Sequence, residues 1–156
     1  MTTTIRDAAS ADAGVIASFV RALAEYEKLA DHAVATDADF AWALAGGRVS
    51  AIIAERDGVP VGFALWYQTF STFTGKPGLY LEDLFVLPDH RQHGVGRLML
   101  RELARRALSG GCARMEWAVL DWNEPAIKFY RAIGARPMNE WTVQRLDRAA
   151  LANLAE

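Results

Sequence analysis

The sequence lacks most of the features that would place it in a specialised class of protein. It has one cysteine, Cys112, so no disulfide can form within the chain. No apolar run approaches the ~18 residues that a membrane-spanning helix needs, and the first residues lack the basic start and apolar core of a secretion signal. Its 17 basic and 19 acidic residues give a net charge of −2, so no basic excess points to nucleic acid. We therefore expect a cytoplasmic protein that binds neither membranes nor nucleic acid.

The composition suits one compact domain. The chain has 156 residues, of which 52% are hydrophobic, enough to bury a sizeable core. No repeat, linker or low-complexity segment interrupts it. We expect a single domain over residues 1–156.

Residues 79–108 form the most informative stretch. Residues 79–87 are apolar or aromatic except for Glu82 and Asp83, which is typical of a central strand covered on both faces and ending before Pro88. The stretch then predicts an amphipathic helix, with apolar residues at every fourth position and basic residues opposite. These are Val95, Met99, Leu103 and Ala107 on one side and Arg97, Arg101 and Arg105 on the other.

The loop Arg91–Gly96, between this strand and this helix, is expected to bind an anion. The first N–H groups of a helix have no intrahelical partner and carry the positive end of the helix dipole. Gly94 and Gly96 let backbone amides approach a ligand, and Arg91 adds a planar cation able to grip phosphate oxygens. A P-loop would end in Gly-Lys-Ser/Thr, and a dinucleotide-binding loop would have a third glycine near position 99. Neither is present, although phosphates remain the expected anions.

The other segments predict an α+β protein. Asp57-Gly58 is expected to form a hairpin turn, and residues 70–78 an irregular loop because they contain two glycines and a proline. Ser10 or Asp12 is expected to cap the first helix. The remaining predicted helices cover residues 37–45 and 124–133, and the remaining strands cover residues 3–6, 49–55, 61–69, 113–120 and 141–146.

Four blocks of sequence, in the same order, resemble the GNAT N-acetyltransferases and in particular their diamine (spermidine/spermine) acetyltransferase branch. The resemblance implies the GNAT acyl-CoA N-acyltransferase fold, a mixed and mostly antiparallel sheet with helices on both faces, and a homodimer. The blocks are Ala24–Leu29, Tyr80–Val86 with the loop Arg91-x-x-Gly94-x-Gly96, Val119–Ala126, and Phe129–Ala135.

The resemblance also implies an acetyl-CoA site and no metal. Asn123 matches a CoA contact of the family and is at the same time a good helix N-cap, with Pro125 in the first turn. The implied pyrophosphate contacts are Arg91 and the amides of Gln92, His93, Gly94, Val95, Gly96 and Arg97, and the implied pantetheine contacts are the backbone groups of Leu84, Phe85 and Val86.

Two residues carry the implied chemistry. Tyr130 would protonate the CoA sulfur, because a phenol of pKa ~10 is a reasonable acid for a thiolate whose thiol has a pKa of ~8.5. Glu82 would help to remove the acceptor's proton through water. Adjacent residues of a strand point to opposite faces, so Asp83 is expected to be structural. The implied acceptor site consists of Tyr26, Glu27, Glu82, Glu140 and Trp141.

The resemblance therefore predicts an N-acetyltransferase that moves an acetyl group from acetyl-CoA to a primary amine by direct attack in a ternary complex. The stretch between Gly134 and Trp141 is shorter than in the family. A diamine, a polyamine and a lysine- or thialysine-like amino acid consequently fit about equally well. A CoA-binding module without turnover, and a protein or antibiotic N-acetyltransferase, are the alternatives.

Overall fold

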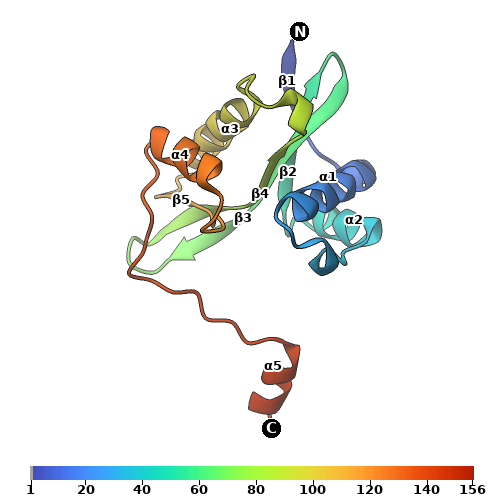
Figure 1. The fold of residues 1–156 in the computed structure, drawn as a ribbon. Helices are drawn as coiled ribbons and strands as arrows, with labels where there is room; N and C mark the ends of the chain where they lie inside the picture. Colours follow the sequence, from blue (N-terminus) through green and yellow to red (C-terminus); the bar gives the residue numbers. More distant parts are fainter. Residues whose placement is uncertain (1) are drawn as a thin grey trace. The chain divides into compact units, whose positions relative to one another are not determined.

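A five-stranded sheet forms the centre of the fold. The computed structural model describes residues 2–156. The strands are β1 (Thr3–Asp7), β2 (Ser50–Arg56), β3 (Val59–Ser71), β4 (Lys76–Val86) and β5 (Met115–Glu116). They are ordered β1-β2-β3-β4-β5, with β1 to β4 antiparallel and β5 parallel to β4 (Figure 1). The predicted mixed, mostly antiparallel sheet is confirmed.

The helices belong to two compact units, one ending at Ala118 and the other covering Val119–Glu156. The first unit contains α1 (Ala13–Tyr26), α2 (Asp37–Ala45) and α3 (Val95–Ser109), together with the single 3-10 turns η1 (Ser10–Asp12), η2 (Ala30–His32) and η3 (Pro88–His90). The second unit contains α4 (Glu124–Ala132) and α5 (Arg148–Leu154). None of the helices found between residues 2 and 156 is both long enough and apolar enough to cross a membrane.

Helices cover both faces of the sheet in the first unit. Phe19 of α1 stacks on Phe63 of β3, with 5.6 Å between the ring centroids. A Cβ atom at the neighbouring Gly62 would lie 3.3 Å from the terminal methyl of Met99 in α3. Because successive residues of a strand face opposite sides, α1 and α3 lie on opposite faces. Helix α2 packs beside α1 (Figure 1).

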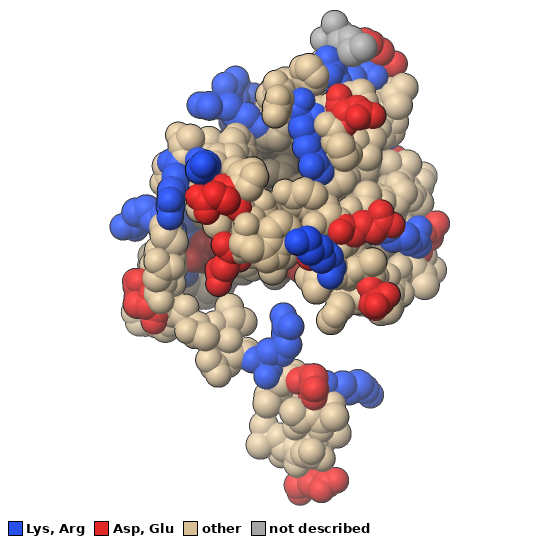
Figure 2. All heavy atoms as spheres, in the orientation of Figure 1, with Lys and Arg blue, Asp and Glu red and all other residues tan. Residues whose placement is uncertain are grey.

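Helix α3 buries the residues that the periodicity predicts. One apolar stripe fixes the helix against the sheet, and the basic stripe stays in solvent. Figure 2 shows basic side chains gathered over α3, whereas both signs of charge mix over α1 and α2. The buried residues are Val95, Met99, Leu103 and Ala107, and the exposed ones are Arg97, Arg101 and Arg105.

The predicted hairpin turn between β2 and β3 is confirmed. Asp57 and Gly58 both have positive φ angles, 52° and 80°. Positive φ at both central residues is the requirement of a type I′ turn, whose twist matches that of the strands it joins. The turn therefore sets the register of β3 against β2.

The segment 70–78, predicted as an irregular loop, is instead mostly strand. β3 continues to Ser71, and only residues 72–75 lie between the two strands. Gly75 has a φ of 65° in this tight turn. A Cβ at Gly78 would lie 2.6 Å from a threonine hydroxyl of β3, so the missing side chain permits a close approach of the strands. The two glycines that suggested a loop therefore allow the tight turn and the close strand approach of a long hairpin.

The start of α1 agrees with the prediction in part. Asp12, one of the two predicted caps, is the N-cap residue of α1, but its side chain makes no cap hydrogen bond, and Ser10 lies in η1. The Asp12 carboxylate accepts a hydrogen bond from the Ala9 N–H at 2.8 Å and pairs with Arg6 at 2.9 Å. The Arg6 guanidinium lowers the pKa of the Asp12 carboxyl. Asp12 therefore ties the turn before the helix to β1.

Two strands predicted after α3 also differ. The strand expected over residues 113–120 is reduced to Met115–Glu116, which pair with residues 79–80 of β4. Residues 141–146, predicted as the last strand, form no strand within the described chain, and Val143 is 86% exposed. Strand formation depends on a neighbour that pairs with the segment, and the apolar alternation of a sequence does not identify that neighbour.

Helix α5 has no counterpart among the predicted elements. The Asp147 carboxylate accepts a hydrogen bond from the Ala150 N–H at 2.9 Å, as an N-cap does. The residues that follow are rich in alanine and leucine, the strongest helix formers. An aspartate before such a run is the signal that predicts this helix.

Candidate functional site

A loop of backbone amides precedes α3. Gln92 and Gly94 take left-handed conformations, with φ of 64° and 77°. Left-handed residues among ordinary ones turn successive N–H groups toward one side, which is how backbone nests bind anions. Gly94 is the N-cap of α3, so no side chain caps the first amides of the helix. The predicted arrangement of strand, glycine-bearing loop and helix is confirmed.

The two glycines of this loop have different reasons to be glycine. Gly94 needs its left-handed backbone, which other residues adopt only with strain. For Gly96, the nearest heavy atom to an added Cβ would be a methyl of Val86 at 4.0 Å, an ordinary contact. The fold itself could therefore accommodate a side chain at position 96. A ligand that approaches the backbone closely is a physical reason for the glycine there.

The other residues assigned to the donor site divide into exposed and buried ones. The side chains at the end of β4 and the start of α3 serve the core, so only their backbone groups are available to a ligand. The exposed side chains are those of Gln92, His93 and Arg97, the buried ones those of Phe85 and Val95, and the partly buried ones those of Leu84 and Val86.

Arg91 makes contacts that its predicted role does not require. Its Nε–H donates a hydrogen bond to the Val86 carbonyl oxygen at 2.8 Å, and its guanidinium lies over the ring of Tyr26. Its role as a phosphate contact stays a prediction.

Strand β4 contains a β-bulge at Glu82. Leu65 of β3 pairs with Asp83, and Trp66 pairs with Leu81, so Glu82 has no cross-strand partner. A bulge places two residues opposite one and interrupts the alternation of faces along the strand. The regular alternation assumed for this strand therefore fails at Glu82.

Both carboxylates of β4 belong to the face covered by α1. Asp83 pairs with Leu65, which shares a core cluster with Phe19 of α1. Glu82 accepts a hydrogen bond from the Tyr67 hydroxyl at 3.4 Å. Tyr67 lies two residues beyond Leu65 and so on the same face of β3. The prediction that Glu82 and Asp83 point to opposite faces is wrong, because it assumed a regular strand.

Three carboxylates lie in this region, of which Asp83 and Glu27 are partly buried and Glu82 is exposed. Burial, with the charges of Glu82 and Glu27 as smaller causes, raises the pKa of the Asp83 carboxyl to about 6. Burial also raises the pKa of Glu27, which follows α1. None of the three takes part in an ion pair described for residues 2–156. A cation bound here would relieve an unfavourable concentration of charge.

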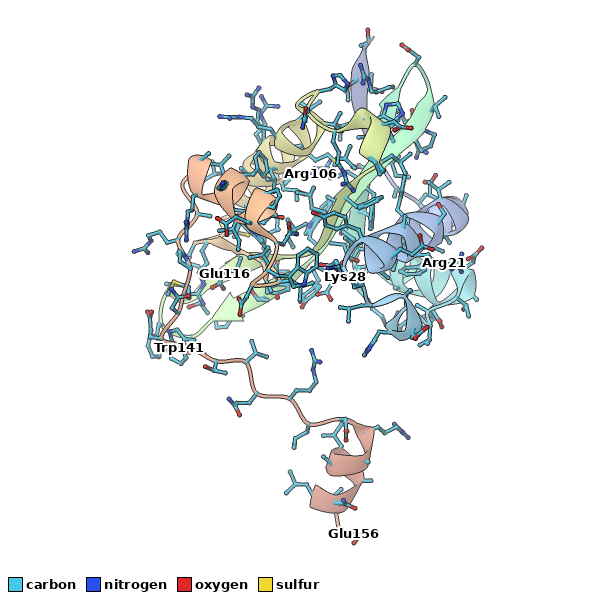
Figure 3. The ribbon with its side chains drawn as sticks, viewed as in Figure 1. Arg21, Lys28, Arg106, Glu116, Trp141 and Glu156 are labelled. Carbon is cyan, nitrogen blue, oxygen red and sulfur yellow. The ribbon has the colours of Figure 1, made fainter. Side chains whose placement is uncertain are left out.

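A strained residue ends α1 next to Tyr26 and Glu27. Lys28 has a φ of 62°, and its N–H and that of Leu29 donate to carbonyls near the end of the helix. Glycine usually occupies this position of a Schellman motif, and a left-handed lysine costs roughly 1 kcal/mol. Such strain is often found at functional sites. Figure 3 shows Lys28 at this end of α1.

Two tyrosines border Glu82. Tyr67 and Tyr80 pair across β3 and β4, with ring centroids 5.2 Å apart. Burial and the charge of Glu82 raise the pKa of both phenols. Tyr67 therefore keeps its proton and donates to Glu82. Sequence reasoning did not connect Tyr67 with Glu82, because strand register and bulges have no local signal.

In the second unit, the predicted CoA contact Asn123 caps α4. It is buried, and its side-chain oxygen accepts a hydrogen bond from the Ala126 N–H at 3.4 Å. Pro125 lies in the first turn, where its missing N–H is not needed. The predicted N-cap is confirmed, and the CoA contact stays a prediction.

Tyr130 lies in the last turn of α4. Its ring centroid is 5.7 Å from that of Phe129. Gly134, with a φ of 96°, donates its N–H to the Arg131 carbonyl, and the N–H of Ala135 donates to the Tyr130 carbonyl. This Schellman motif explains the glycine of Phe-Tyr-x-x-x-Gly, since it ends the helix just after Tyr130.

The predicted acceptor residues divide between the two units. The first unit brings together Tyr26, Glu27 and Glu82 and adds Asp83. Glu140 and Trp141 lie in the second unit, on an exposed segment without regular structure (Figure 3). Within residues 2–156, no three or more histidine, cysteine or acidic side chains are grouped as metal ligands.

Replacing Asp83 with asparagine should stabilise the protein at pH 7 and have little effect at pH 4. The carboxyl has a reference pKa of 3.8 and a folded pKa of about 6. As pH rises between these values the unfolded state ionises first, so the native state loses stability, at about 1.4 kcal/mol per pKa unit. Asp83→Asn should thus gain roughly 3 kcal/mol over wild type at pH 7.

Denaturant unfolding at both pH values measures this gain. Asp89→Asn, which removes an exposed carboxylate, is the control and should show no comparable difference between the two pH values. An equal effect of Asp83→Asn at pH 4 and pH 7 would contradict the raised pKa.

Comparison with known proteins agrees with these features. Residues 16–135 match the acetyltransferase (GNAT) family. The matched range includes β4 with its bulge, the loop Arg91–Gly96 before α3 (the amide loop), and α4 with Tyr130. It covers well over half of the chain.

Several relatives are named as N-acetyltransferases or as similar to one. Thialysine N-epsilon-acetyltransferase of Sus scrofa is 36% identical over 164 residues, covering 97% of this chain and 96% of that protein. L-ornithine N5-acetyltransferase NATA1 of Arabidopsis thaliana is 41% identical over 95 residues, covering 61% and 42%. Spermidine/spermine N(1)-acetyltransferase-like protein 1 of Homo sapiens is 36% identical over 98 residues, covering 61% and 14%.

The fold agrees with the family as well. An integron cassette protein from the mobile metagenome of V. cholerae has a TM-score of 0.81 and 27% sequence identity to this chain, covering 100% of this chain and 99% of that one. Sequence, fold and the amide loop before α3 lead to the same assignment. The chain is a member of the GNAT family of N-acetyltransferases.

Proposed function

We propose that this N-acetyltransferase moves an acetyl group from acetyl-CoA to the primary amine of a small cationic acceptor, by direct attack in a ternary complex. The observation that carries the proposal is the group of carboxylates formed by the exposed Glu82 and the partly buried Glu27 and Asp83 beside one face of the sheet. They suit an ammonium ion better than a neutral or anionic acceptor.

The donor side of the proposal uses backbone groups. The amides of Gln92–Arg97 would hold the pyrophosphate, and the free space beside Gly96 fits a ligand that lies against the backbone. Backbone groups of Leu84–Val86 would hold the pantetheine arm and polarise the carbonyl. Asn123 and Pro125 would add contacts from the start of α4. Acetyl-CoA supplies the thioester carbon that the amine attacks.

The acceptor side must bind a cation and then remove its proton. An alkyl amine with a pKa of ~10.4 is neutral in only about one molecule in 2,500 at pH 7. Asp83 and Glu27 would attract the ammonium, and Glu82, held by the Tyr67 hydroxyl, would accept its proton through water. Tyr26, Glu140 and Trp141 would line the remainder of the acceptor site.

Tyr130 would return a proton to the departing thiolate. A phenol of pKa ~10 gives its proton to a thiolate whose thiol has a pKa of ~8.5 at a cost of only about 2 kcal/mol, which is within the reach of a general acid. The Schellman motif at Gly134 holds this part of α4 in a defined conformation. The attacking amine would thus lose its proton to Glu82 through water, and the departing thiolate would receive a proton from Tyr130.

Among cationic amines, the relatives favour a lysine-like amino acid first and a polyamine second. The thialysine enzyme of Sus scrofa aligns with 97% of this chain, whereas the spermidine/spermine-like protein aligns with 61%. A homodimer and a cytoplasmic location remain predictions from the sequence.

The experiment that tests the function is thiol release from acetyl-CoA with a panel of amines. The panel contains thialysine, lysine, ornithine, spermidine, an aminoglycoside and a peptide. We expect release with at least one of the first four. Calorimetric binding of CoA without release on any amine would indicate a CoA-binding module. Release only with the aminoglycoside or the peptide would indicate an antibiotic or protein N-acetyltransferase.

Gly96→Ala should weaken CoA binding roughly tenfold or more while leaving thermal stability unchanged. The fold has room for the added methyl, so only a ligand against the backbone would meet it. Calorimetric titration with CoA measures the effect. Gly14→Ala adds a methyl in α1, away from the loop, and is the control. An unchanged dissociation constant in Gly96→Ala would mean that no ligand lies against this backbone.

Tyr130→Phe should lower kcat by about 10²-fold, because it removes a general acid and no packing volume. The affinity for acetyl-CoA should hardly change. Steady-state kinetics and a CoA titration test both statements. A kcat within about twofold of wild type would show that water or another group protonates the thiolate.

Glu82→Gln should lower kcat/KM by roughly 10²-fold at neutral pH and recover as pH approaches the amine's own pKa, since the amine then loses its proton without help. Asp83→Asn should instead raise KM for a cationic amine, with no recovery at high pH. Profiles of kcat/KM against pH, for thialysine and spermidine, separate the two roles. Recovery in Asp83→Asn alone would make Asp83 the proton acceptor.

A further inference from the structure

Arg91, the first residue of the amide loop, is turned toward the protein. Its Nε–H donates to the Val86 carbonyl oxygen at 2.8 Å, in a partly buried hydrogen bond. Its guanidinium carbon lies 4.8 Å from the centroid of the Tyr26 ring and 5.3 Å from that of the Phe85 ring. Both distances are within the range of cation–π contacts.

The backbone before Arg91 explains how its side chain reaches back to β4. The 3-10 turn η3 is closed by hydrogen bonds from His90 N–H to the Leu87 carbonyl at 2.9 Å and from Arg91 N–H to the Pro88 carbonyl at 3.2 Å. The turn reverses the chain directly after the strand. A planar guanidinium can then donate along its edge to Val86 and place its face on an aromatic ring.

These contacts join three parts of the candidate site. Val86 and Phe85 end β4, Arg91 begins the amide loop, and Tyr26 ends α1 just before Glu27. The negative charge of Glu27 in turn contributes to the raised pKa of Asp83. The Arg91 side chain is therefore a direct link between the strand end assigned to the donor and the helix end assigned to the acceptor.

Arg91 is not described as an ion-pair partner of these carboxylates. Among the ion pairs described for residues 2–156, none joins Arg91 to Glu27 or Asp83. Its charge lies on aromatic rings, so it can fix the end of α1 without neutralising the acidic group that would attract the amine.

We propose that Arg91 is a positioning residue, which holds the Tyr26 end of α1 against the end of β4 and so sets the place of the amine acceptor, and that it is not a phosphate ligand. The inference rests on the proposed function, because it concerns the same site.

Arg91→Lys distinguishes the two roles. Lysine keeps the charge and is itself a good phosphate binder, but it cannot combine the edge hydrogen bond with the stacked face. We expect KM for the amine to rise about tenfold in both Arg91→Lys and Arg91→Gln, and the dissociation constant of CoA to stay within about threefold. Arg101→Gln, on the exposed side of α3, should change neither and is the control. Loss of CoA affinity in Arg91→Gln that Arg91→Lys restores would overturn the proposal in favour of a phosphate ligand.

A double-mutant cycle tests the contact with Tyr26. In a Tyr26→Leu background, Arg91→Lys should have little further effect on KM, because the ring that it stacks on is already gone. In a Tyr26→Phe background, which keeps the ring, the full effect should remain. Additive effects of Arg91→Lys and Tyr26→Leu would show that the two residues act independently.

Amide hydrogen exchange separates failure of this inference from failure of the proposed function. Without any acceptor, Arg91→Lys should speed exchange of the amides of residues 24–29 by about tenfold, since α1 loses a contact at its end. The rest of α1 should be unaffected. Unchanged exchange at residues 24–29 would overturn the proposal even if the protein acetylates amines.

Discussion

The pairing of β4 with β3 is the constraint on which the site depends. Its register places Asp83 opposite Leu65 and leaves Glu82 unpaired in a bulge, so two adjacent carboxylates come to one face. The same strand ends at Val86, where the chain turns through η3 into the loop of amides. A shift of this register would move the carboxylates and the amide loop together, because one strand carries both.

The cluster of carboxylates on this face lowers the stability of the folded state at neutral pH, and this cost points to a function. At neutral pH the partly buried Asp83 is ionised near Glu27 and Glu82, although burial raises its pKa to about 6. A chain selected only for stability would have an apolar or paired residue there. Perturbed carboxylates in one place are typical of binding and catalytic sites, and in an N-acetyltransferase an ammonium acceptor is the natural counter-charge.

Small local devices hold the reacting parts in position. Lys28 adopts a strained left-handed conformation that ends α1 beside Glu27, and Gly134 ends α4 just after Tyr130. Gly96 is different, because neither its conformation nor its neighbours require glycine. Arg91 stacks on Tyr26, which couples the amide loop to α1. Each device connects a segment expected to bind one substrate with the scaffold that orients it.

The sequence by itself determined what depends on short-range pattern. The period of α3, the Asp57-Gly58 turn, the Asn123 cap and the glycine-bearing loop all follow from residues within a few positions of one another. Tertiary structure alone decided the bulge at Glu82, the long hairpin over residues 70–78, the absence of a strand at residues 141–146 within the described chain, and the inward turn of Arg91. These features depend on which distant segment pairs or packs with each residue, and a local pattern does not specify that partner.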